Sequence, residues 1–369
     1  MTVAQLDFYA CVPGNASRMF SSRHDALNQP IGEVQLKLAL NGMYVVNRKF
    51  NPTLIQYDSN YLTTSLDMKL SSKTPTISYF LEKVLPHFEL PPKVVDIGAG
   101  QGEFVYELIR EGILATGFDT VARQESSVLF AENWYPGKTH GDLFVMRCVL
   151  PHISEPFDFL DAILEAAPSA SVLIEYQSLN WILTNHAWNQ ISHDHVNIFW
   201  LDSFTNRYEV IDSETFADGE WEWVLLRKKT SHGAVESAPE KPQYLESDMF
   251  SKLITSRRES IEIVRRLGRQ TIVWGAAGKG SVLAHALTQE APQSFSEKIS
   301  CVDVDPLKQG KFLEASGVQI FSPQDAIEQQ DENTLILVSN PRHLREVSAF
   351  LGNSRRVFSV QTLNVEFRF

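Results

Sequence analysis

The pattern of apolar and polar positions changes along the chain and predicts distinct regions. Residues 1–70 carry scattered apolar side chains and repeated aromatics without a long helical period, which predicts a small, irregular lobe. From Thr74, apolar residues recur at helical spacing until Pro91 and Pro92 interrupt them, and the apolar run KVVDIGAG follows. We therefore expect a helix that leads into a buried strand.

The segment after this strand alternates between helical and extended patterns. In order, it reads as helix EFVYELIREG, strand ATGFD, strand LFVMRCVL, helix FDFLDAILEAA and strand SVLIEY, with WEWVLLRKK as a late strand. Strands that alternate with helices form a parallel sheet covered on both faces. The expected fold class is α/β, with a Rossmann-like domain over residues 71–230.

A segment without periodicity separates this domain from the last third of the chain. Residues 231–243 are rich in Ser, Pro and Glu, which is typical of a linker. A long amphipathic helix is expected from roughly Tyr244 to Leu267. The segments TIVWGAAGKG, ISCVDVDP and TLILVSN then repeat the order of strand, turn and helix. Residues 244–369 are therefore predicted to form a second Rossmann-like α/β domain.

Composition and charge restrict the kinds of function. The length of 369 residues suggests two or three domains. The net charge of −12 argues against a protein that binds nucleic acid through its phosphates. No stretch approaches the roughly 20 apolar residues that span a bilayer, and the N-terminus lacks the pattern of a signal peptide. We expect a cytoplasmic protein without membrane contact, and its oligomeric state stays open.

The cysteine residues exclude two kinds of structural cross-link. Cys11, Cys148 and Cys301 are far apart in the sequence and odd in number. Neither a disulfide framework nor an all-cysteine zinc site can be built from them.

The glycine-rich turn after the first predicted strand is a candidate ligand site. Asp96 ends that strand, and Gly98, Gly100 and Gly102 precede a helix. Glycines let the chain turn sharply and let a ligand approach the backbone without an intervening Cβ. A dinucleotide fingerprint would need a glycine where a glutamate stands, and the Gly-Lys-Ser/Thr of a Walker loop is absent from this turn. The pattern D-x-G-x-G-x-G resembles the first motif of class I S-adenosylmethionine-dependent methyltransferases, which implies that this turn, with Ala99, borders the amino-acid end of the cofactor.

Further pocket residues are expected from the order of the strands. Asp119 ends the next predicted strand, 23 residues after Asp96, and its carboxylate can accept hydrogen bonds from both hydroxyls of a ribose. Ligands of such sheets bind beyond the carboxyl ends of the strands. Asp142 is therefore expected near the adenine, and Arg147 to His152 along the pocket. The alternative is an empty tight turn in which Asp119 caps a helix.

The segment WNQISHDHVNIFW is a candidate catalytic site. It places His193, Asp194 and His195 between aromatic residues. Histidine titrates near neutral pH, and neighbours that exclude water tune its basicity, so one of these histidines is a candidate general base. Two histidines at this spacing are a poor metal chelate unless the loop curls. The alternative is a histidine that is hydrogen-bonded inside a packed loop.

Several motifs together resemble the sugar C-methyltransferase family, which acts on nucleotide-linked ketosugars in deoxysugar biosynthesis. The matching segments are DIGAGQGEF, RCVLPHISEPFDFL, ISHDHVNIFW, WGAAGKGSVLAHAL and CVDVDPLKQGKFLEASGVQIFSP. The resemblance covers about residue 74 to the end of the chain. It implies His195 as the catalytic base, with Asp194 where the family usually has a glutamate and Ser192 where it usually has a tyrosine.

The resemblance also has consequences for the N-terminal lobe. The family's zinc module of four cysteines is degraded here, because Cys11 remains but Gly14 occupies the next ligand position. No metal is therefore expected. Tyr57 and Tyr61 keep the family's aromatic pattern and are expected to face the substrate.

We hypothesise carbon methylation of a nucleotide-linked ketosugar with S-adenosyl-L-methionine as cofactor. His195 would take the proton next to the ketone, and a polar side chain would stabilise the enolate oxygen. His193, Asn197 and Ser192 are candidates for that second task. An oxygen or nitrogen acceptor on another small metabolite would need no enolate site. A third hypothesis is a non-catalytic binding subunit that retains the fold.

The C-terminal glycine turn has two interpretations. Gly275, Gly278 and Gly280 follow a predicted strand, and Asp303 and Asp305 close the next one. The turn could hold a second nucleotide or phosphate at a helix N-terminus, where Lys279 would suit a diphosphate. A tight turn that only packs a Rossmann-like unit needs the same glycines.

Overall fold

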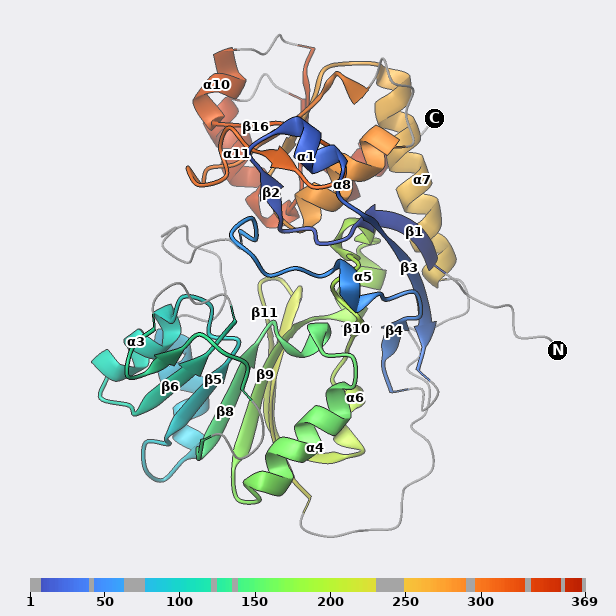
Figure 1. The fold of residues 1–369 in the computed structure, drawn as a ribbon. Helices are drawn as coiled ribbons and strands as arrows, with labels where there is room; N and C mark the ends of the chain where they lie inside the picture. Colours follow the sequence, from blue (N-terminus) through green and yellow to red (C-terminus); the bar gives the residue numbers. More distant parts are fainter. Residues whose placement is uncertain are drawn as a thin grey trace, which may run out of the picture.

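The computed structural model shows two α/β units with a smaller β lobe between them (Figure 1). It describes residues 8–39, 43–62, 77–120, 125–134, 139–229, 249–289, 296–328, 333–352 and 356–366. The predicted linker at 231–243 lies outside the described residues, as do residues 244–248 of the long helix predicted after it. In the part of the chain that is described, no helix is long and apolar enough to cross a membrane.

The first α/β unit is built on a seven-stranded sheet. Its strand order is β11-β12-β9-β8-β5-β6-β7. The strands are β5 (Val94–Ile97), β6 (Ala115–Phe118), β7 (Leu129–Phe130), β8 (Leu143–Arg147), β9 (Ser171–Gln177), β11 (Tyr208–Phe216) and β12 (Trp221–Lys228). All neighbours are parallel except that β12 runs antiparallel to β9 and β11. The strand order reverses at β5, so the glycine turn after β5 stands at the topological switch point.

Helices cover both faces of this sheet, as the alternating pattern predicted. On one face, α4 (Pro156–Ala166) buries apolar residues in one cluster with Val95. On the other, α3 (Glu103–Arg110) shares a cluster with Val94 and with Phe80 of the predicted entry helix. Successive residues of a strand point to opposite faces, which is why Val94 and Val95 separate in this way.

The predicted entry helix has an uneven pitch. It runs as α2 (Ile77–Tyr79), continues as wider π turns over η2 (Phe80–Val84) and tightens into η3 (Leu85–His87) before the two prolines. Short helices α5 (Leu179–Thr184), η5 (Trp188–Gln190) and α6 (Asp202–Thr205) follow β9.

The N-terminal lobe is more regular than the sequence predicted. An antiparallel sheet joins β1 (Phe8–Pro13), β3 (Ile31–Leu38), β4 (Val45–Asn47) and β10 (Asn197–Ile198) in that order. Buried and exposed residues alternate along β1 and β3, which is the strand pattern that the expectation of an irregular lobe overlooked. The fourth strand, β10, comes from the histidine segment, so the sheet is completed by residues far away in the sequence.

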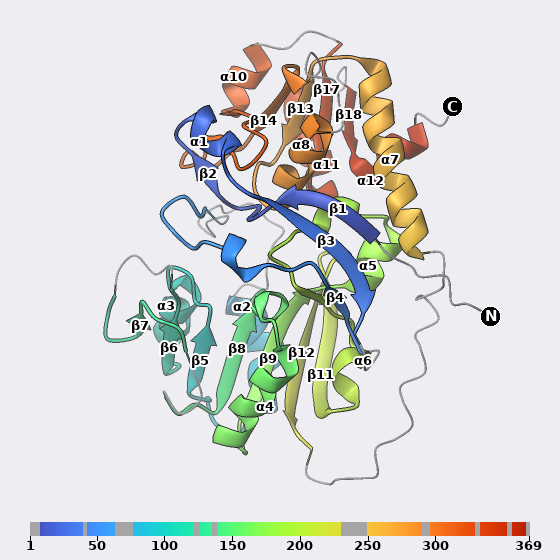
Figure 2. The same cartoon turned by 45° about the vertical axis from the view of Figure 1, so that its right-hand side comes forward.

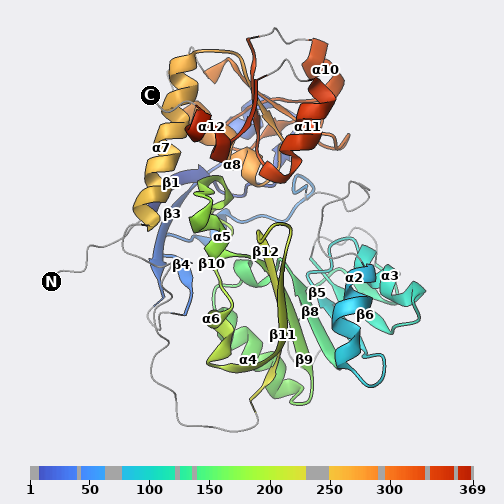
Figure 3. The ribbon, with the colours of Figure 1, turned by 180° about the vertical axis from the view of Figure 1, so that it is seen from behind.

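The C-terminal unit has a parallel five-stranded sheet of order β16-β14-β13-β17-β18. Its strands are β13 (Thr271–Trp274), β14 (Ile299–Val302), β16 (Ile320–Phe321), β17 (Leu335–Val338) and β18 (Arg356–Ser359). Figure 3 shows α7 (Met249–Leu267) beside α12 (Val360–Glu366), while α8 (Lys279–Gln289), α10 (Pro323–Glu328) and α11 (Leu344–Leu351) complete the layers. The second Rossmann-like arrangement is therefore confirmed.

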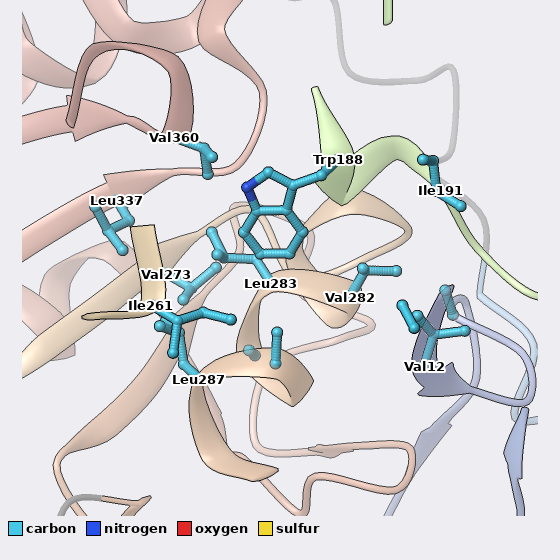
Figure 4. Packing of buried hydrophobic residues seen from close by; sticks show 14 of the residues in the cluster. Val12, Trp188, Ile191, Ile261, Val273, Val282, Leu283, Leu287, Leu337 and Val360 are labelled. Atoms are coloured by element: carbon cyan, nitrogen blue, oxygen red, sulfur yellow. The ribbon is translucent and has the colours of Figure 1, made fainter. Parts of the chain in front are cut away.

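A shared apolar core fixes the three parts relative to one another. Trp188 of η5 is 1% exposed and belongs to one cluster with Leu283 of α8 and Val12 of β1. Figure 4 shows the Trp188 ring above Leu283, with Val12 approaching from the N-terminal sheet. A second link is the pairing of β2 (Met19–Phe20) with β15 (Phe312–Leu313). Burial of large apolar side chains between the units makes their relative placement part of the folded structure.

Candidate active site

A cavity of about 1990 Å³ lies between the seven-stranded and the five-stranded sheet. Its walls include residues that directly follow strands of the first sheet: Gly98 after β5, Asp119 after β6 and Cys148 after β8. The opposite wall includes residues that follow strands of the second sheet in the same way, namely Gly275, Asp303 and Ser339. Figure 2 shows the N-terminal strands running across the junction between the two units. We call this cavity the central cleft.

The first glycine turn has the open geometry expected of a ligand site. Gly98, Gly100 and Gly102 have φ of +77°, +59° and +87°, a region that favours glycine. A Cβ on Gly98 would lie 2.3 Å from a methyl of Val149, whereas one on Gly100 would meet nothing within 4 Å. The Gly100 N–H donates to Oδ2 of Asp119 at 2.7 Å. The turn is therefore braced by Asp119 and leaves its middle open to the cleft.

Ala99 and Gly102 shape this turn from behind rather than line the cleft. Ala99 is 8% exposed, and its N–H bonds to the carbonyl of Phe118. Gly102 caps α3, where a Cβ would lie 2.9 Å from Leu129.

A row of buried charges lies beneath the turn. Asp96 is 2% exposed, and its Oδ1 has no hydrogen-bond partner. Burial raises the pKa of Asp96 to about 7, although nearby Arg147 opposes the shift. The Arg147 guanidinium lies 4.6 Å from the Phe104 ring centre, with Nε 3.4 Å from Oε2 of Glu175. Asp96 does not itself line the central cleft, whereas Arg147 does. A buried carboxylate behind the wall favours a cationic ligand group in front of it, such as the amino group of an amino-acid moiety.

The structure places His152 beside the histidine segment, whereas the sequence predicted it as a cofactor-binding residue. His152, Asp194 and His195 all line the central cleft, and one ligand-type atom from each lies within 4.8 Å of the others. The two imidazole rings are edge to face at 4.8 Å, and His152 Nδ1 lies 2.8 Å from the backbone oxygen of Asp194. These groups form a compact acid–base cluster, and the same donor types also bind divalent cations.

Burial makes the imidazole of His195 unusually hard to protonate. Burial, together with nearby His152, lowers the pKa of His195 to about 4, and the Asp194 carboxylate opposes this shift. The pKa of Asp194 is itself lowered by His195 and His152, with burial opposing, and Ser192 donates a hydrogen bond to it. At neutral pH the cluster therefore offers a neutral imidazole beside a carboxylate.

Two residues of the histidine segment do not belong to the cleft. His193 is fully buried, with Nδ1 2.9 Å from the Glu33 carbonyl oxygen and Nε2 accepting from the Asn51 N–H at 3.1 Å. Asn197 is buried and donates to the carbonyl of Ile153 at 2.6 Å. The prediction that His193 or Asn197 stabilises an enolate is wrong, because the His193 side chain bonds to β3 and to the Asn51 backbone, and the Asn197 side chain bonds to the Ile153 backbone. For His193, the alternative of a histidine hydrogen-bonded in a packed loop holds.

The placement of Asp142 near the adenine is also wrong. Asp142 precedes β8, so it lies at the amino end of that strand, and its Oδ2 accepts from the Lys93 N–H at 2.8 Å. Ligands of a parallel sheet bind at the opposite edge.

Two tyrosines of the N-terminal lobe line the cleft from a third side. The rings of Tyr57 and Tyr61 are edge to face, with centres 5.0 Å apart. Burial raises the pKa of both phenols, and Asp194 and Asp119 raise it further. Both phenols therefore lie within electrostatic range of the histidine cluster and of the first glycine turn.

The second glycine turn repeats the geometry of the first. The Ala276 N–H donates to Oδ2 of Asp303 at 2.9 Å, as Gly100 does to Asp119. Gly275 has φ +95°, and a Cβ on Gly278 would meet nothing within 4 Å. Each sheet thus offers a glycine turn after its first strand and an acid after its second, and both pairs open into one cleft.

Lys279 is engaged by an acid that sequence reasoning missed. The Lys279 Nζ donates to Oε1 of Glu220, which is 1% exposed. The other carboxylate oxygen of Glu220, Oε2, lies 3.8 Å from Nη1 of Arg342. Glu220 stands in the turn between β11 and β12 and has no local sequence signal. Likewise nothing in the strand that Glu175 occupies indicates its contact with Arg147. Lys279 is therefore largely neutralised by Glu220.

Comparisons with known proteins agree with the geometry of the first unit. Residues 73–211 match the model of a family described as a methyltransferase domain. A C-methyltransferase of Streptomyces niveus, NovU, is 27% identical over 230 residues, which cover 56% of this chain and 53% of that protein. The chain thus aligns with about half the length of this curated relative.

Solved structures give weaker likenesses. A putative methyltransferase of Haloferax volcanii, in complex with the activator Trm112, is 14% identical, covers 43% of this chain and 90% of its own, and has a TM-score of 0.34. An N1-methyltransferase of Burkholderia thailandensis with bound S-adenosylhomocysteine is 16% identical, covers 39% and 74%, and has a TM-score of 0.30. The sheet order and the glycine turn agree with the match of residues 73–211 to a methyltransferase domain that uses S-adenosyl-L-methionine.

Proposed function

We propose that this protein transfers a methyl group to carbon next to the ketone of a nucleotide-linked sugar. The observation that carries the proposal is the pair of matched glycine turns, with Asp119 and Asp303, on opposite walls of one cleft. One turn serves the cofactor nucleoside and the other suits the nucleotide of the acceptor. The similarity to a C-methyltransferase supports the same acceptor chemistry. A cytoplasmic location, as the sequence suggests, is part of this proposal.

The residues present fit the cofactor. S-adenosyl-L-methionine, when bound, supplies a methyl group activated by a positive sulfur. Asp119 would hold the ribose hydroxyls, and the open backbone at Gly100 would lie against the amino-acid moiety. Asp96, buried beneath the turn with its Oδ1 unpartnered, would attract the amino group electrostatically, and Arg147 at the cleft wall would face the carboxylate. Neutralising the Asp96 carboxylate in this way removes the cost of its burial.

The acceptor would span the cleft from the second sheet to the tyrosine pair. Asp303 would bind the sugar hydroxyls of its nucleoside, and Arg342 and Lys279 would face its diphosphate. Glu220 pairs with both cations, closely with Lys279 and at 3.8 Å with Arg342, and the looser pair leaves Arg342 better placed for an anionic group. Tyr57 and Tyr61 would hold the ketosugar near the histidine cluster.

His195 would act as the general base. A neutral imidazole beside Asp194 can take the α-proton of the ketone as that C–H bond breaks, leaving an enolate whose carbon accepts the methyl group. The Asp194 carboxylate would stabilise the imidazolium that forms. Ser192 and His152 line the same part of the cleft and are the candidates for a hydrogen bond to the enolate oxygen.

Proton exchange tests the proposal directly. The protein, S-adenosyl-L-methionine and a nucleoside diphosphate-linked 4-ketosugar are mixed in deuterated water and followed by NMR and mass spectrometry. Loss of the α-proton signal together with a new methyl on carbon is expected. Methyl transfer without exchange would indicate an oxygen or nitrogen acceptor, and the absence of both would remove this substrate class.

A matched pair of variants isolates the base. His195→Asn should abolish exchange and transfer, whereas His186→Asn changes an exposed histidine outside the cleft, at φ +50° where asparagine is tolerated, and should retain both. The reaction should also survive a metal chelator. Loss of activity on chelation, restored by a divalent cation, would mean that the cluster binds a metal and that His195 is not the base.

A further inference from the structure

Arg18 of the N-terminal lobe lies outside the central cleft, and its buried side chain donates four hydrogen bonds. It is 3% exposed, and its guanidinium donates to Asp58 through Nη2 at 2.7 Å and Nε at 3.4 Å. Nη1 donates to Gln29 at 3.0 Å and to Glu314 at 3.3 Å. The planar fork of arginine is suited to such fixed, two-point contact with a carboxylate, and lysine cannot reproduce it.

The Asp58 side of this network holds the tyrosine pair. Asp58 directly follows Tyr57, and its Oδ1 also accepts from the Asn60 N–H at 2.9 Å. The backbone of Arg18 pairs with that of Tyr61 in an antiparallel bridge, flanked by a hydrogen bond from Met19 N to Asn60 O at 2.9 Å. The segment that carries both tyrosines is thus attached to Arg18 through side chain and backbone.

The Glu314 side of the network reaches the C-terminal unit. Glu314 is fully buried, and its Oε1 accepts from the Asn15 N–H at 2.8 Å. Close by, the Gly278 N–H of the second glycine turn donates to the Ala16 carbonyl at 3.1 Å. Arg18 therefore stands between the C-terminal unit and the tyrosines that face the acceptor side of the cleft.

We propose that Arg18 is a positioning residue for the acceptor: through Asp58 and Glu314 it sets the distance between the Tyr57–Tyr61 pair and the C-terminal wall of the cleft. The side-chain hydrogen bonds of Arg18 go to Asp58, Gln29 and Glu314, which belong neither to the first glycine turn nor to the histidine cluster. Cofactor binding and proton removal therefore do not depend on it directly. The acceptor readout below rests on the proposed function, whereas the spectroscopic readout does not.

Fluorine NMR tests the positioning without any acceptor. The full chain is labelled with 3-fluorotyrosine, and the Tyr57 and Tyr61 signals are assigned with Tyr57→Phe and Tyr61→Phe. At pH 8, Arg18→Lys and Asp58→Asn should each shift both signals while S-adenosylhomocysteine affinity stays within twofold of wild type. The control Arg207→Lys breaks another two-point Arg–Asp contact, to Asp161 on the surface outside the cleft, and should shift neither. Unshifted tyrosine signals in Arg18→Lys would overturn the proposal.

Kinetics separate positioning from simple loss of folded protein. With the 4-ketosugar nucleotide that the wild type converts, Arg18→Lys and Asp58→Asn should each raise KM at least tenfold and change kcat less than threefold. The KM of the double variant should not exceed that of the single variant with the higher KM. Partial unfolding would instead lower kcat at constant KM, and that result, or additive effects in the double variant, would overturn the proposal. A wild-type protein that converts no such acceptor would count against the proposed function alone, because the tyrosine signals would still report on Arg18.

Discussion

Two aspartates show how strongly the place of a residue relative to its strand decides whether it reaches the central cleft. Asp119 follows a strand and lines the cleft, whereas Asp142 precedes one and bonds to Lys93 at the far edge of the sheet. The sequence predicted both residues in the cofactor pocket. Their positions relative to the strand place Asp119 at the central cleft and Asp142 at the opposite end of the strands, away from it.

This difference yields a direct prediction on cofactor affinity. Asp119→Ala removes a charged acceptor of hydrogen bonds worth about 1.5–3 kcal/mol each, so it should weaken S-adenosylhomocysteine binding by at least tenfold. Asp142→Ala is the matched control and should bind within twofold of wild type. Isothermal titration calorimetry measures both. Equal affinities for the two variants would contradict the role given to Asp119.

The lowered pKa of His195 predicts the acid limit of activity. The base must be neutral in the free enzyme, and burial together with His152 lowers the pKa of His195 to about 4. Activity should therefore fall only as the pH drops through about 4. With a base of ordinary histidine pKa, half of the activity would already be lost near pH 6.5. The pH dependence of kcat/KM gives this limit. An acid limb near pH 6.5 would show that His195 is solvated like a surface histidine or that another group is the base.

At the scale of elements, the turn after β5 depends on backbone conformation and on close packing together. Gly98 has a left-handed φ and no room for a Cβ against Val149, whereas Gly112, at the end of α3, has a similar φ of +80° and open space around it. The two glycines therefore separate the cost of backbone strain from the cost of overlap.

Alanine at these two positions should differ in effect. Gly112→Ala should cost only the strain of a left-handed residue, about 1 kcal/mol of unfolding free energy. Gly98→Ala adds an overlap that must displace Val149, so it should cost about 2–4 kcal/mol and also weaken S-adenosylhomocysteine binding. Urea unfolding and calorimetry measure the two effects. Equal stability of the variants would mean that the turn relaxes around the added methyl group.

At the scale of the whole molecule, the buried acid Glu314 joins two lobes and should make their association depend on pH. Burial raises the pKa of Glu314 to about 7, with the Asn15 N–H and Arg18 opposing. The native state then holds a proton that the unfolded chain releases near its ordinary value of about 4.5. Stability should fall as the pH rises from about 4.5 to 7 and change little above that.

Glu314→Gln tests this dependence. Glutamine cannot titrate and still offers an oxygen to the Asn15 N–H, so the variant should lack this contribution, which amounts to roughly 3 kcal/mol across the window. Urea unfolding of both proteins at pH 5 and pH 8 gives the comparison. Parallel pH dependence in the two proteins would show that Glu314 does not titrate in this range.

The sequence by itself determined the elements whose signal is local. Strands β5, β6, β8, β9, β12, β13, β14 and β17, helices α3, α4, α7 and α8, and both glycine turns follow from apolar periodicity and glycine spacing, because each depends on residues close together in the chain. The remaining strands of the two sheets, β7, β11, β16 and β18, were not predicted. Strands β1 and β3 were not predicted from the sequence, although buried and exposed positions alternate along both in the structure. Their sheet is completed by β10, which no local pattern connects to residues 8–47.

Only the tertiary structure decided which polar residues meet. His152 joins Asp194 and His195 across more than forty positions, Glu220 reaches Lys279, and Arg18 reaches Glu314. The same packing turns His193 away from the cleft although it stands two residues from His195. Contacts of this kind depend on how the units pack against one another. The local sequence around a charged or polar side chain does not show which distant residue it will contact in the folded protein.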